Sequence, residues 1–355
     1  MTKLFHLLTC ALKFGVIPRF SARQHTQSGL KCQKKLKIMF FGTDDFAVKS
    51  LSRIHQEYLN GGCVEAVEVT CLQMKSLIPA VVKFAKENDL KVHTWPPDLD
   101  VISRENFDMG VVASFGKLIP ERVIERFPLG IINVHGSLLP RWRGAAPVIH
   151  SLINGDKVTG VSIMRVKPKR FDAGEIFAMK EVTITEDMLR TELTRILAST
   201  GADLLMQVIS NFDKYLDEVK YQDEREVTYA PLVNKDISKV DWSILTNIEV
   251  YNLWRAVGDM YKLRTFYSES SASMKIGIIL PPSVLDGAEL DEGRDPGSLV
   301  FLRRGKRKKF VCVKCRVGWV AISDIYYHNK KVMTPTDFYN GFLTKPGNHR
   351  LVNEI

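Results

Sequence analysis

Residues 131–147 read "IINVHGSLLPRWRGAAP": an apolar run carries Asn133 and His135, and a loop rich in glycine and proline follows. Side chains alternate between the two faces of a β-strand, so Asn133 and His135 point to one face while Ile132 and Val134 point to the other. The stretch therefore predicts a buried strand that presents an amide and an imidazole together near its end.

Strand and helix patterns alternate on both sides of this stretch. An apolar run at 36–42 leads into a helix that Thr43 or Asp44 can cap. This alternation predicts a doubly wound α/β domain whose parallel sheet binds ligands at the carboxyl ends of its strands. The sequence has no GxGxxG spacing here, which argues against a dinucleotide. The expected strands are residues 36–42, 64–70, 91–95, 108–116, 130–135 and 160–166.

The second half of the chain has a different pattern. Residues 213–242 are charged and loosely patterned, which is typical of a linker that crosses the surface. A helix at about 247–257 precedes short alternating strands separated by glycine and proline, which predicts a small β-barrel. We therefore expect a leader at 1–33, an α/β domain at 35–212, a linker at 213–242 and a barrel domain at 243–345.

Charge is distributed unevenly along the 355 residues, whose formal net charge is +10. Residues 1–43 contain eight Lys or Arg and no acid, which is typical of a mitochondrial transit peptide; the alternative is a basic disordered tail. Residues 298–355 have a net charge of +9, whereas residues 44–297 have −7. A nucleic-acid partner is therefore expected toward the C-terminal end. Because no apolar run approaches the ~18 residues of a membrane span, no membrane partner is expected.

Six cysteines are scattered along the chain, and we expect reduced thiols. The pair in "CVKC" (312–315) lies in an alternating run and has no second pair at zinc spacing. We interpret it as structural and predict no metal site.

A second polar loop completes a candidate site. Residues 167–175, "KPKRFDAGE", follow the expected strand at 160–166 and present Asp172 beside a glycine. An amide and a protonated imidazole donate hydrogen bonds to an oxyanion, and a carboxylate orients the imidazole and holds it protonated. Asn133, His135 and Asp172 therefore predict an acyl-transfer site. The alternatives are a hydrogen-bonded pair in a core and a simple turn residue at Asp172.

These residues carry a family resemblance. The motif "NVHGSLLPRWRGAAP" (133–147) together with "FDAG" (171–174) resembles the formyltransferases that use 10-formyltetrahydrofolate. The likeness covers residues 36–345, and the whole chain is similar to the branch that formylates methionyl-tRNA. The segment "PKRFDAG" (168–174) and the basic N-terminal segment resemble the animal mitochondrial members more than the bacterial ones. Further matching segments are "FFGTDDFA" (40–47), "VVASFGKLIP" (111–120), "TYAP" (228–231), "DW" (241–242) and "DFYNGFL" (337–343).

The resemblance implies a Rossmann-like catalytic domain and a C-terminal OB-type barrel that helps to hold tRNA. It also implies that the formyl group of 10-formyltetrahydrofolate passes to the α-amine of initiator methionyl-tRNA, for translation initiation in the mitochondrial matrix. In that scheme Asn133 and His135 stabilise the oxyanion, and Asp172 manages the proton of the amine through water. No metal and no covalent enzyme intermediate are implied, and a monomer is expected.

Binding residues are assigned from the resemblance and from the charge pattern. The expected folate-binding residues are Ser137, Leu138, Leu139, Pro140, Phe115 and Gly116. The expected tRNA-binding residues are Arg141, Arg143, Lys169, Arg170, Arg303, Arg304, Lys306, Arg307, Lys308 and Lys309. The last six form a predicted hairpin tip, and the alternative for each basic group is a solvated loop. Bacterial members carry a long basic loop where this chain has only residues 71–79, which puts acceptor-stem recognition by this loop in doubt.

Other functions fit the sequence less well. A formyltransferase acting on a nucleotide amino-sugar shares the motif, but a sugar nucleotide needs a pocket rather than a long cationic surface. A hydrolase of formyl-folate needs no barrel domain. A tRNA-binding protein with an inactive domain has no need for intact Asn133, His135 and Asp172.

Overall fold

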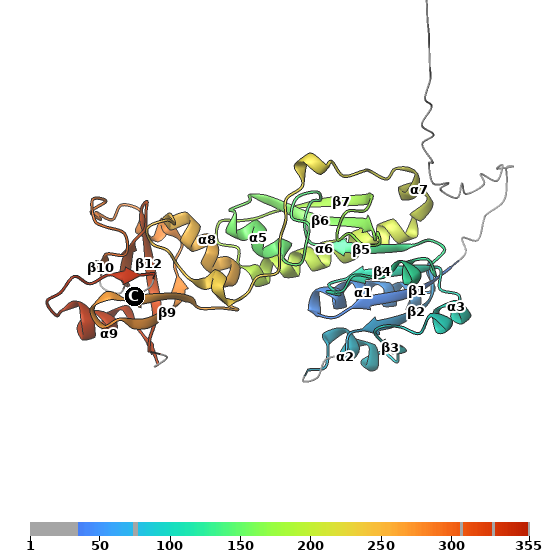
Figure 1. Cartoon of the computed structure of the whole chain (residues 1–355), viewed down its shortest axis with the longest axis horizontal. Helices are drawn as coiled ribbons and strands as arrows, with labels where there is room; N and C mark the ends of the chain where they lie inside the picture. Colours follow the sequence, from blue (N-terminus) through green and yellow to red (C-terminus); the bar gives the residue numbers. More distant parts are fainter. Residues whose placement is uncertain (1–34, 74–76, 306–307, 329–330, 354–355) are drawn as a thin grey trace, which may run out of the picture. The chain divides into compact units, whose positions relative to one another are not determined.

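The structure is a computed structural model that describes residues 35–73, 77–305, 308–328 and 331–353. The transit peptide expected at 1–33 lies outside these residues. An α/β domain in blue to yellow-green precedes a β-rich domain in orange to red (Figure 1). Within the described ranges, no helix is both long and apolar enough to cross a membrane.

The sheet of the α/β domain has the strand order β3-β2-β1-β4-β5-β6-β7. Its neighbours from β3 to β5 are parallel, whereas β6 runs antiparallel to β5 and β7 antiparallel to β6. The strands are β1 (Leu36–Gly42), β2 (Val64–Cys71), β3 (Val92–Thr94), β4 (Met109–Ala113), β5 (Ile131–His135), β6 (Val158–Arg165) and β7 (Ile176–Thr183).

The strand expected at 160–166 is β6, and the expectation that it runs parallel to its neighbour in the sheet is wrong. The connection from β5 to β6 contains the helix α5 (Pro147–Ile153) and brings the chain back to the carboxyl end of β5. Strand β6 therefore starts at the same edge where β5 ends, and His135 pairs with Ser162. Strand β7 then returns as the second arm of a hairpin that was not expected.

Two helices of this domain, α1 and α3, begin after an aspartate that caps them with its side chain. Helix α1 starts after Asp44, whose side chain accepts a hydrogen bond from the backbone N–H of Ala47 at 3.1 Å, as expected. The helices are α1 (Asp45–Leu59), α2 (Ala80–Glu87), α3 (Leu99–Glu105), α4 (Glu121–Ile124), α5, α6 (Arg190–Ser210) and α7 (Phe212–Asp217).

Strand β5 divides its side chains between two apolar layers. Ile132 and Val134 pack in the cluster that contains the buried residues of α1 and α6. Ile131 packs on the other face, in a separate cluster with Phe41 and other aromatic residues. The period of two is thus confirmed, and it leaves the two polar side chains of β5 on the face away from α1 and α6.

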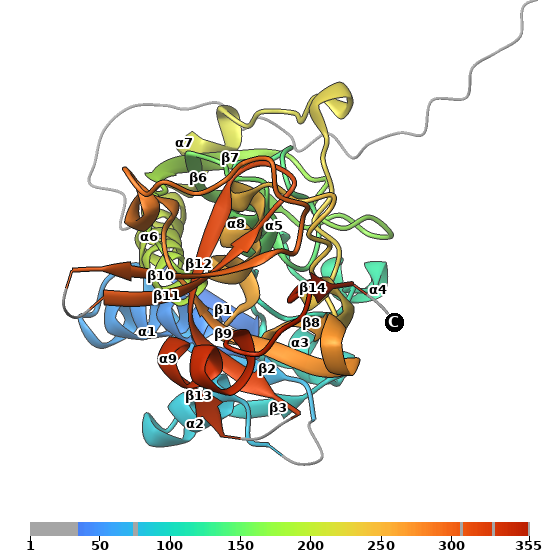
Figure 2. The same cartoon turned by 90° about the vertical axis from the view of Figure 1, so that its left-hand side faces the viewer.

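The C-terminal domain is an antiparallel sheet that closes on itself. Its strand order is β10-β11-β12-β9-β8-β14, with β13 beside β12, and a bridge between Ser298 and Arg350 joins the start of β10 to the start of β14. Figure 2 shows β14 beside β8. The expected α/β domain followed by a small barrel is confirmed. The elements are α8 (Asn247–Val257), β8 (Leu263–Tyr267), β9 (Ala272–Ile279), β10 (Leu299–Arg304), β11 (Lys308–Lys314), β12 (Trp319–Tyr327), β13 (Val332–Met333), α9 (Pro335–Phe338) and β14 (Leu351–Val352).

The segment between the domains is hydrogen-bonded to loops of the α/β domain. Lys220 and Ile176 exchange backbone hydrogen bonds of 2.8 and 2.9 Å. Farther along, the N–H of Arg143 donates to the carbonyl of Thr228 at 2.9 Å, and the N–H of Ala230 donates to the carbonyl of Arg143 at 2.7 Å. The charged pattern of this segment therefore does not mean that it is simply solvated.

Candidate active site

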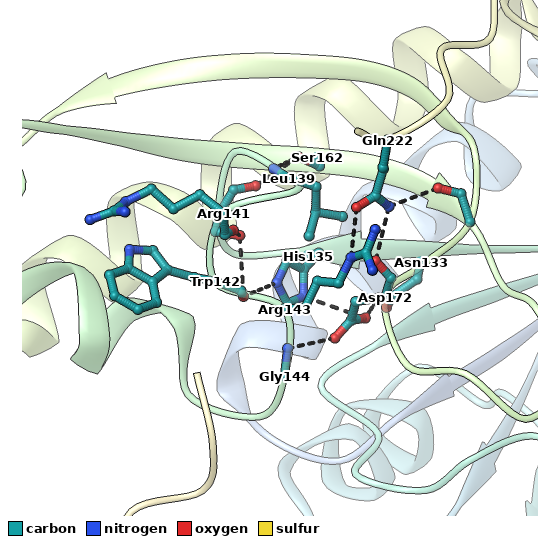
Figure 3. A network of polar contacts seen from close by, with 12 residues as sticks. Asn133, His135, Leu139, Arg141, Trp142, Arg143, Gly144, Ser162, Asp172 and Gln222 are labelled. Carbon is teal, nitrogen blue, oxygen red and sulfur yellow. Dashed lines mark hydrogen bonds and ion pairs between the residues drawn. The ribbon is translucent and has the colours of Figure 1, made fainter. Parts of the chain in front are cut away.

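Three polar side chains meet beside the carboxyl-terminal half of β5. Asn133 and His135 project from the strand, and Asp172 reaches them from the loop between β6 and β7 (Figure 3). The carboxylate Oδ1 of Asp172 lies 3.3 Å from Nδ2 of Asn133 and 3.6 Å from Nδ1 of His135. The structure therefore brings the expected amide, imidazole and carboxylate into one cluster.

Asp172 reaches this cluster by a route that differs from the expected one. Because β6 is antiparallel, its last residue, Arg165, pairs with Ile132 near the start of β5. The loop then turns back, with a bridge between Lys167 and Arg170 and left-handed backbone at Lys169 (φ 62°) and Asp172 (φ 50°). Such backbone is uncommon outside glycine and requires support from its surroundings.

The end of this loop is also held closely. A Cβ on Gly174 would lie 1.7 Å from the carbonyl oxygen of Arg165, so only glycine fits there. Next to it, Glu175 forms an ion pair of 2.6 Å with Lys167. Burial raises the pKa of Glu175, but the hydrogen bonds from Lys167 and the backbone, together with the charges of Lys167 and Arg165, lower it overall.

The ring of His135 has a fixed orientation. Its Nε2 lies 2.9 Å from the carbonyl oxygen of Trp142. A carbonyl oxygen only accepts hydrogen bonds, so Nε2 carries a proton and Nδ1 faces Asp172. A second proton on Nδ1 makes the buried ring positive, and the carboxylate of Asp172 then supplies the opposite charge.

The carboxylate of Asp172 is oriented from two sides. Asn133 donates to Oδ1, and the backbone N–H of Gly144 donates to Oδ2 at 2.9 Å. The side-chain amide of Asn133 has two N–H groups, so one remains for a further acceptor. The cluster can thus direct an amide N–H and an imidazolium N–H toward one developing oxyanion.

A pocket opens beside Asn133 and Asp172. Its empty space is about 370 Å³ including solvent at the mouth, and its walls combine apolar side chains with cations. The lining residues besides these two are Val112, Lys117, Leu118, Ile119, Met164, Val166, Lys167, Arg170 and Phe171. Apolar walls suit a flat ring, and the cations suit an anionic group on the same ligand.

The residues expected to bind folate are not those that line this pocket. Ser137 is fully buried and its hydroxyl donates to the carbonyl of Arg141 at 2.6 Å. Leu139 packs against Met164 and Ile176, and Phe115 packs against Phe41 and Trp95. None of the six expected residues is among those that line the pocket, whereas Lys117 and Leu118, which directly follow Gly116, are.

Of the basic residues in the α/β domain, Arg143 does not fit the expected contact with a phosphate. Its side chain is only 5% exposed, and its guanidinium contacts Gln222 and Glu224. The hydrogen bond from Arg143 lowers the pKa of Glu224. The burial of Arg143 could not be predicted from the sequence, because Gln222 and Glu224 lie about 80 positions later in the chain.

The other three basic residues of this domain have different surroundings. Arg141 forms a two-point ion pair with Asp156 and lies over the ring of Trp142, with the side chain 45% exposed. Lys169 is 85% exposed. Arg170 is one of the residues that line the pocket.

The basic hairpin of the barrel presents its cations on two faces. Arg303 pairs with Lys309 and Arg304 with Lys308 across β10 and β11, so the two pairs point to opposite sides. The guanidinium of Arg304 is bound to the carbonyls of Val284 and Asp286. Lys306 and Arg307 lie outside the described residues. The four described cations, Arg303, Arg304, Lys308 and Lys309, therefore do not share one face of the hairpin.

The cysteines that the structure describes are Cys63, Cys71, Cys312 and Cys315, and all are free thiols. Burial raises the pKa of Cys312 and that of Cys315 to about 12, so both are protonated and unreactive at neutral pH. Over the described ranges, no cluster of three or more His, Cys, Asp or Glu could hold a metal ion.

Comparison with known proteins identifies the class to which this fold and site belong. Residues 36–209 match the formyl transferase family, and residues 233–343 match the formyl transferase C-terminal domain. The chain is thus a formyl-transferring enzyme.

Its relatives define the family more narrowly. The mitochondrial methionyl-tRNA formyltransferase of Rattus norvegicus is 37% identical over 330 residues, which cover 91% of this chain and 83% of the relative. The mitochondrial enzyme of Homo sapiens is also 37% identical, over 86% of this chain and 78% of the relative. The methionyl-tRNA formyltransferase of Acetivibrio thermocellus is 32% identical, over 88% and 98%. The chain therefore belongs to the methionyl-tRNA formyltransferase family.

Solved structures with lower sequence identity to this chain have the same fold. A sugar 3N-formyl transferase is 19% identical, with a TM-score of 0.56 over 83% of this chain and 99% of that chain. The N-formyltransferase of Helicobacter canadensis is 17% identical, with a TM-score of 0.57 over 82% and 100%. At these identities the likeness shows a shared fold.

Proposed function

We propose that the protein transfers the formyl group of 10-formyltetrahydrofolate to the α-amine of initiator methionyl-tRNA, acting as a monomer in the mitochondrial matrix. The observation that carries this proposal is the meeting of Asn133, His135 and Asp172 beside an apolar pocket lined with cations. The apolar walls suit the ring system of the folate, and Lys117, Lys167 and Arg170 suit the carboxylates of its glutamate tail.

In this proposal each of the three residues has a separate task. The α-amine attacks the formyl carbon, and the oxyanion that forms accepts hydrogen bonds from Asn133 and from Nδ1–H of His135. Asp172 pairs with the positive ring and takes part in removing the amine proton through water. The bond from the formyl carbon to N10 of the folate then breaks, and N10 keeps the electron pair and gains a proton.

The choice of acceptor separates this function from its alternatives. We expect rapid formylation of charged initiator tRNA, and neither an amino-sugar nucleotide nor water should accept the formyl group at a comparable rate. The measurement is the initial rate of tetrahydrofolate release with each acceptor at equal concentration. Faster transfer to the sugar nucleotide would reject the proposal, and release without any acceptor would indicate a hydrolase.

One prediction concerns the basic hairpin. Replacing both Arg303 and Lys309, which share one face, with Ser should raise the KM for charged tRNA and lower the slope of log KM against log salt by about 1.4–1.8, because two phosphate contacts are lost. The KM for the folate should not change. Lys345→Ser removes a cation from the same domain and serves as the control. An unchanged tRNA KM and slope in the double variant would show that the hairpin is only a solvated turn.

A second prediction concerns targeting. The curated relatives above include mitochondrial enzymes, and residues 1–43 are basic and free of acids. Deleting residues 1–30 should abolish import into isolated mitochondria and leave the kcat of the purified protein intact, because the first strand starts at Leu36. Import assays with matrix fractionation provide the measurement. Normal import of the shortened chain would exclude a transit peptide in this segment.

A further inference from the structure

We propose that Gln222 is a positioning residue that holds the loop of Asp172 in its catalytic conformation; this inference rests on the catalytic role proposed for Asp172. The side-chain amide of Gln222 donates to two carbonyls of that loop, to Asp172 at 2.9 Å and to Gly174 at 2.8 Å (Figure 3). Gln222 thus contacts the backbone on both sides of residue 173 and touches neither the pocket nor the carboxylate itself.

The loop conformation explains why such a contact is needed. Asp172 has left-handed backbone (φ 50°), which an L-residue adopts only when neighbouring groups determine it. The two carbonyls that Gln222 binds belong to a turn with no strand partner of its own. By donating to both carbonyls, the amide of Gln222 fixes the backbone at Asp172. This backbone conformation directs the carboxylate of Asp172 toward Asn133 and His135.

The orientation of the Gln222 amide is itself determined. Nε of Arg143 lies 2.9 Å from Oε1 of Gln222, and an arginine only donates, so the amide oxygen faces Arg143 and the NH2 faces the loop. Arg143 is buried and held in turn by the carboxylate of Glu224, at 3.2 and 3.3 Å. Arg143, assigned from sequence to a phosphate, therefore serves to orient the amide.

The backbone around Gln222 is anchored at two points. Lys220 pairs with Ile176 on one side, and on the other the hydroxyl of Thr228 accepts from the backbone N–H of Trp142 at 2.9 Å. Trp142 is the residue whose carbonyl binds Nε2 of His135. The same linker segment therefore contacts the chain next to both Asp172 and His135.

The test uses a substitution that keeps the acceptor oxygen of the Gln222 side chain and removes its NH2 donor. Gln222→Glu keeps an acceptor for Arg143 but places a carboxylate oxygen against the two loop carbonyls, which then have no donor. We expect kcat to fall about 10- to 100-fold, with the KM values for tRNA and folate within twofold of the original, because the loop is misplaced and the pocket is not. Gln222→Ala should lower kcat in the same way. Arg225→Ala, on the same segment but with its guanidinium hydrogen-bonded to Asp223, is the matched control.

A double-mutant cycle shows whether Gln222 acts through Asp172. In protein that already carries Asp172→Asn, the further change Gln222→Glu should lower kcat by less than twofold. A full additional loss in that background, an unchanged kcat for Gln222→Glu alone, or a raised KM without a fall in kcat would each overturn the inference. If Asp172→Asn alone has normal kcat, the proposed catalytic role has failed instead.

Hydrogen exchange gives a readout that does not depend on activity. Amides of residues 167–175 should exchange about tenfold faster in Gln222→Glu than in the original protein, while those of β5 stay protected. Unchanged exchange in this loop would show that Gln222 does not hold it.

Discussion

Replacing Asn133 by Ala is expected to lower kcat about 100-fold or more while the protein still folds. The substitution removes one N–H donor to the oxyanion, whose charge exists only in the transition state, so kcat should fall and the KM values should change little. His135→Ala removes the other donor and should have a loss of similar size. Steady-state kinetics on protein whose circular dichroism matches the original provides the measurement.

The control is another asparagine of the same domain that caps a helix. Asn211→Ala removes an amide that donates to the carbonyl of Gln207 at 3.1 Å, far from β5 in the sequence, and should leave kcat within about twofold. Full activity in folded Asn133→Ala protein would refute the oxyanion role assigned to this residue.

Replacing Asp172 by Asn is expected to lower kcat by about the same factor, on the order of 100-fold, for a different reason. Nε2 of His135 already donates to Trp142, so Nδ1 can donate only when the ring is positive. A neutral amide offers no charge to that ring, and it no longer assists removal of the amine proton. The KM for folate should change little, because the shape of the pocket is kept.

This second prediction is checked by single-turnover formyl transfer, which excludes effects on product release. Asp203→Asn provides the control, since this carboxylate forms an ion pair of 3.3 Å with Arg53 on the domain surface. An Asp172→Asn protein that transfers formyl at the original rate would show that Asp172 is a structural residue of the loop.

The parts of the structure that follow from local pattern could be predicted from sequence. The period of two in β5 placed Asn133 and His135 on one face, and the cap of α1 was narrowed to Thr43 or Asp44, because both signals lie within a few residues. The barrel followed from short alternating strands between turns. The catalytic and binding roles of the site residues stay predictions until kinetics are measured.

The remaining features depend on contacts between distant segments. Whether β6 runs parallel or antiparallel is decided by the path of the chain after β5, and an alternating pattern is the same in both directions. The burial of Arg143 depends on partners at 222 and 224, and a charged segment gives no sign that Gln222 will bind a loop 50 residues earlier. The loop pattern and the family motif both indicated Asp172, but the path by which this residue reaches the cluster could be seen only in the fold.

The bridge between Ser298 and Arg350 has a consequence for the solubility of the C-terminal domain. It brings the last described strand, β14, against the edge of β8 and next to the start of β10. Without these few residues, both strands would present unpaired backbone groups to other molecules, and such open edges are templates for intermolecular strand pairing. The C-terminal segment thus protects the barrel from aggregation although it contributes no residue to the candidate active site.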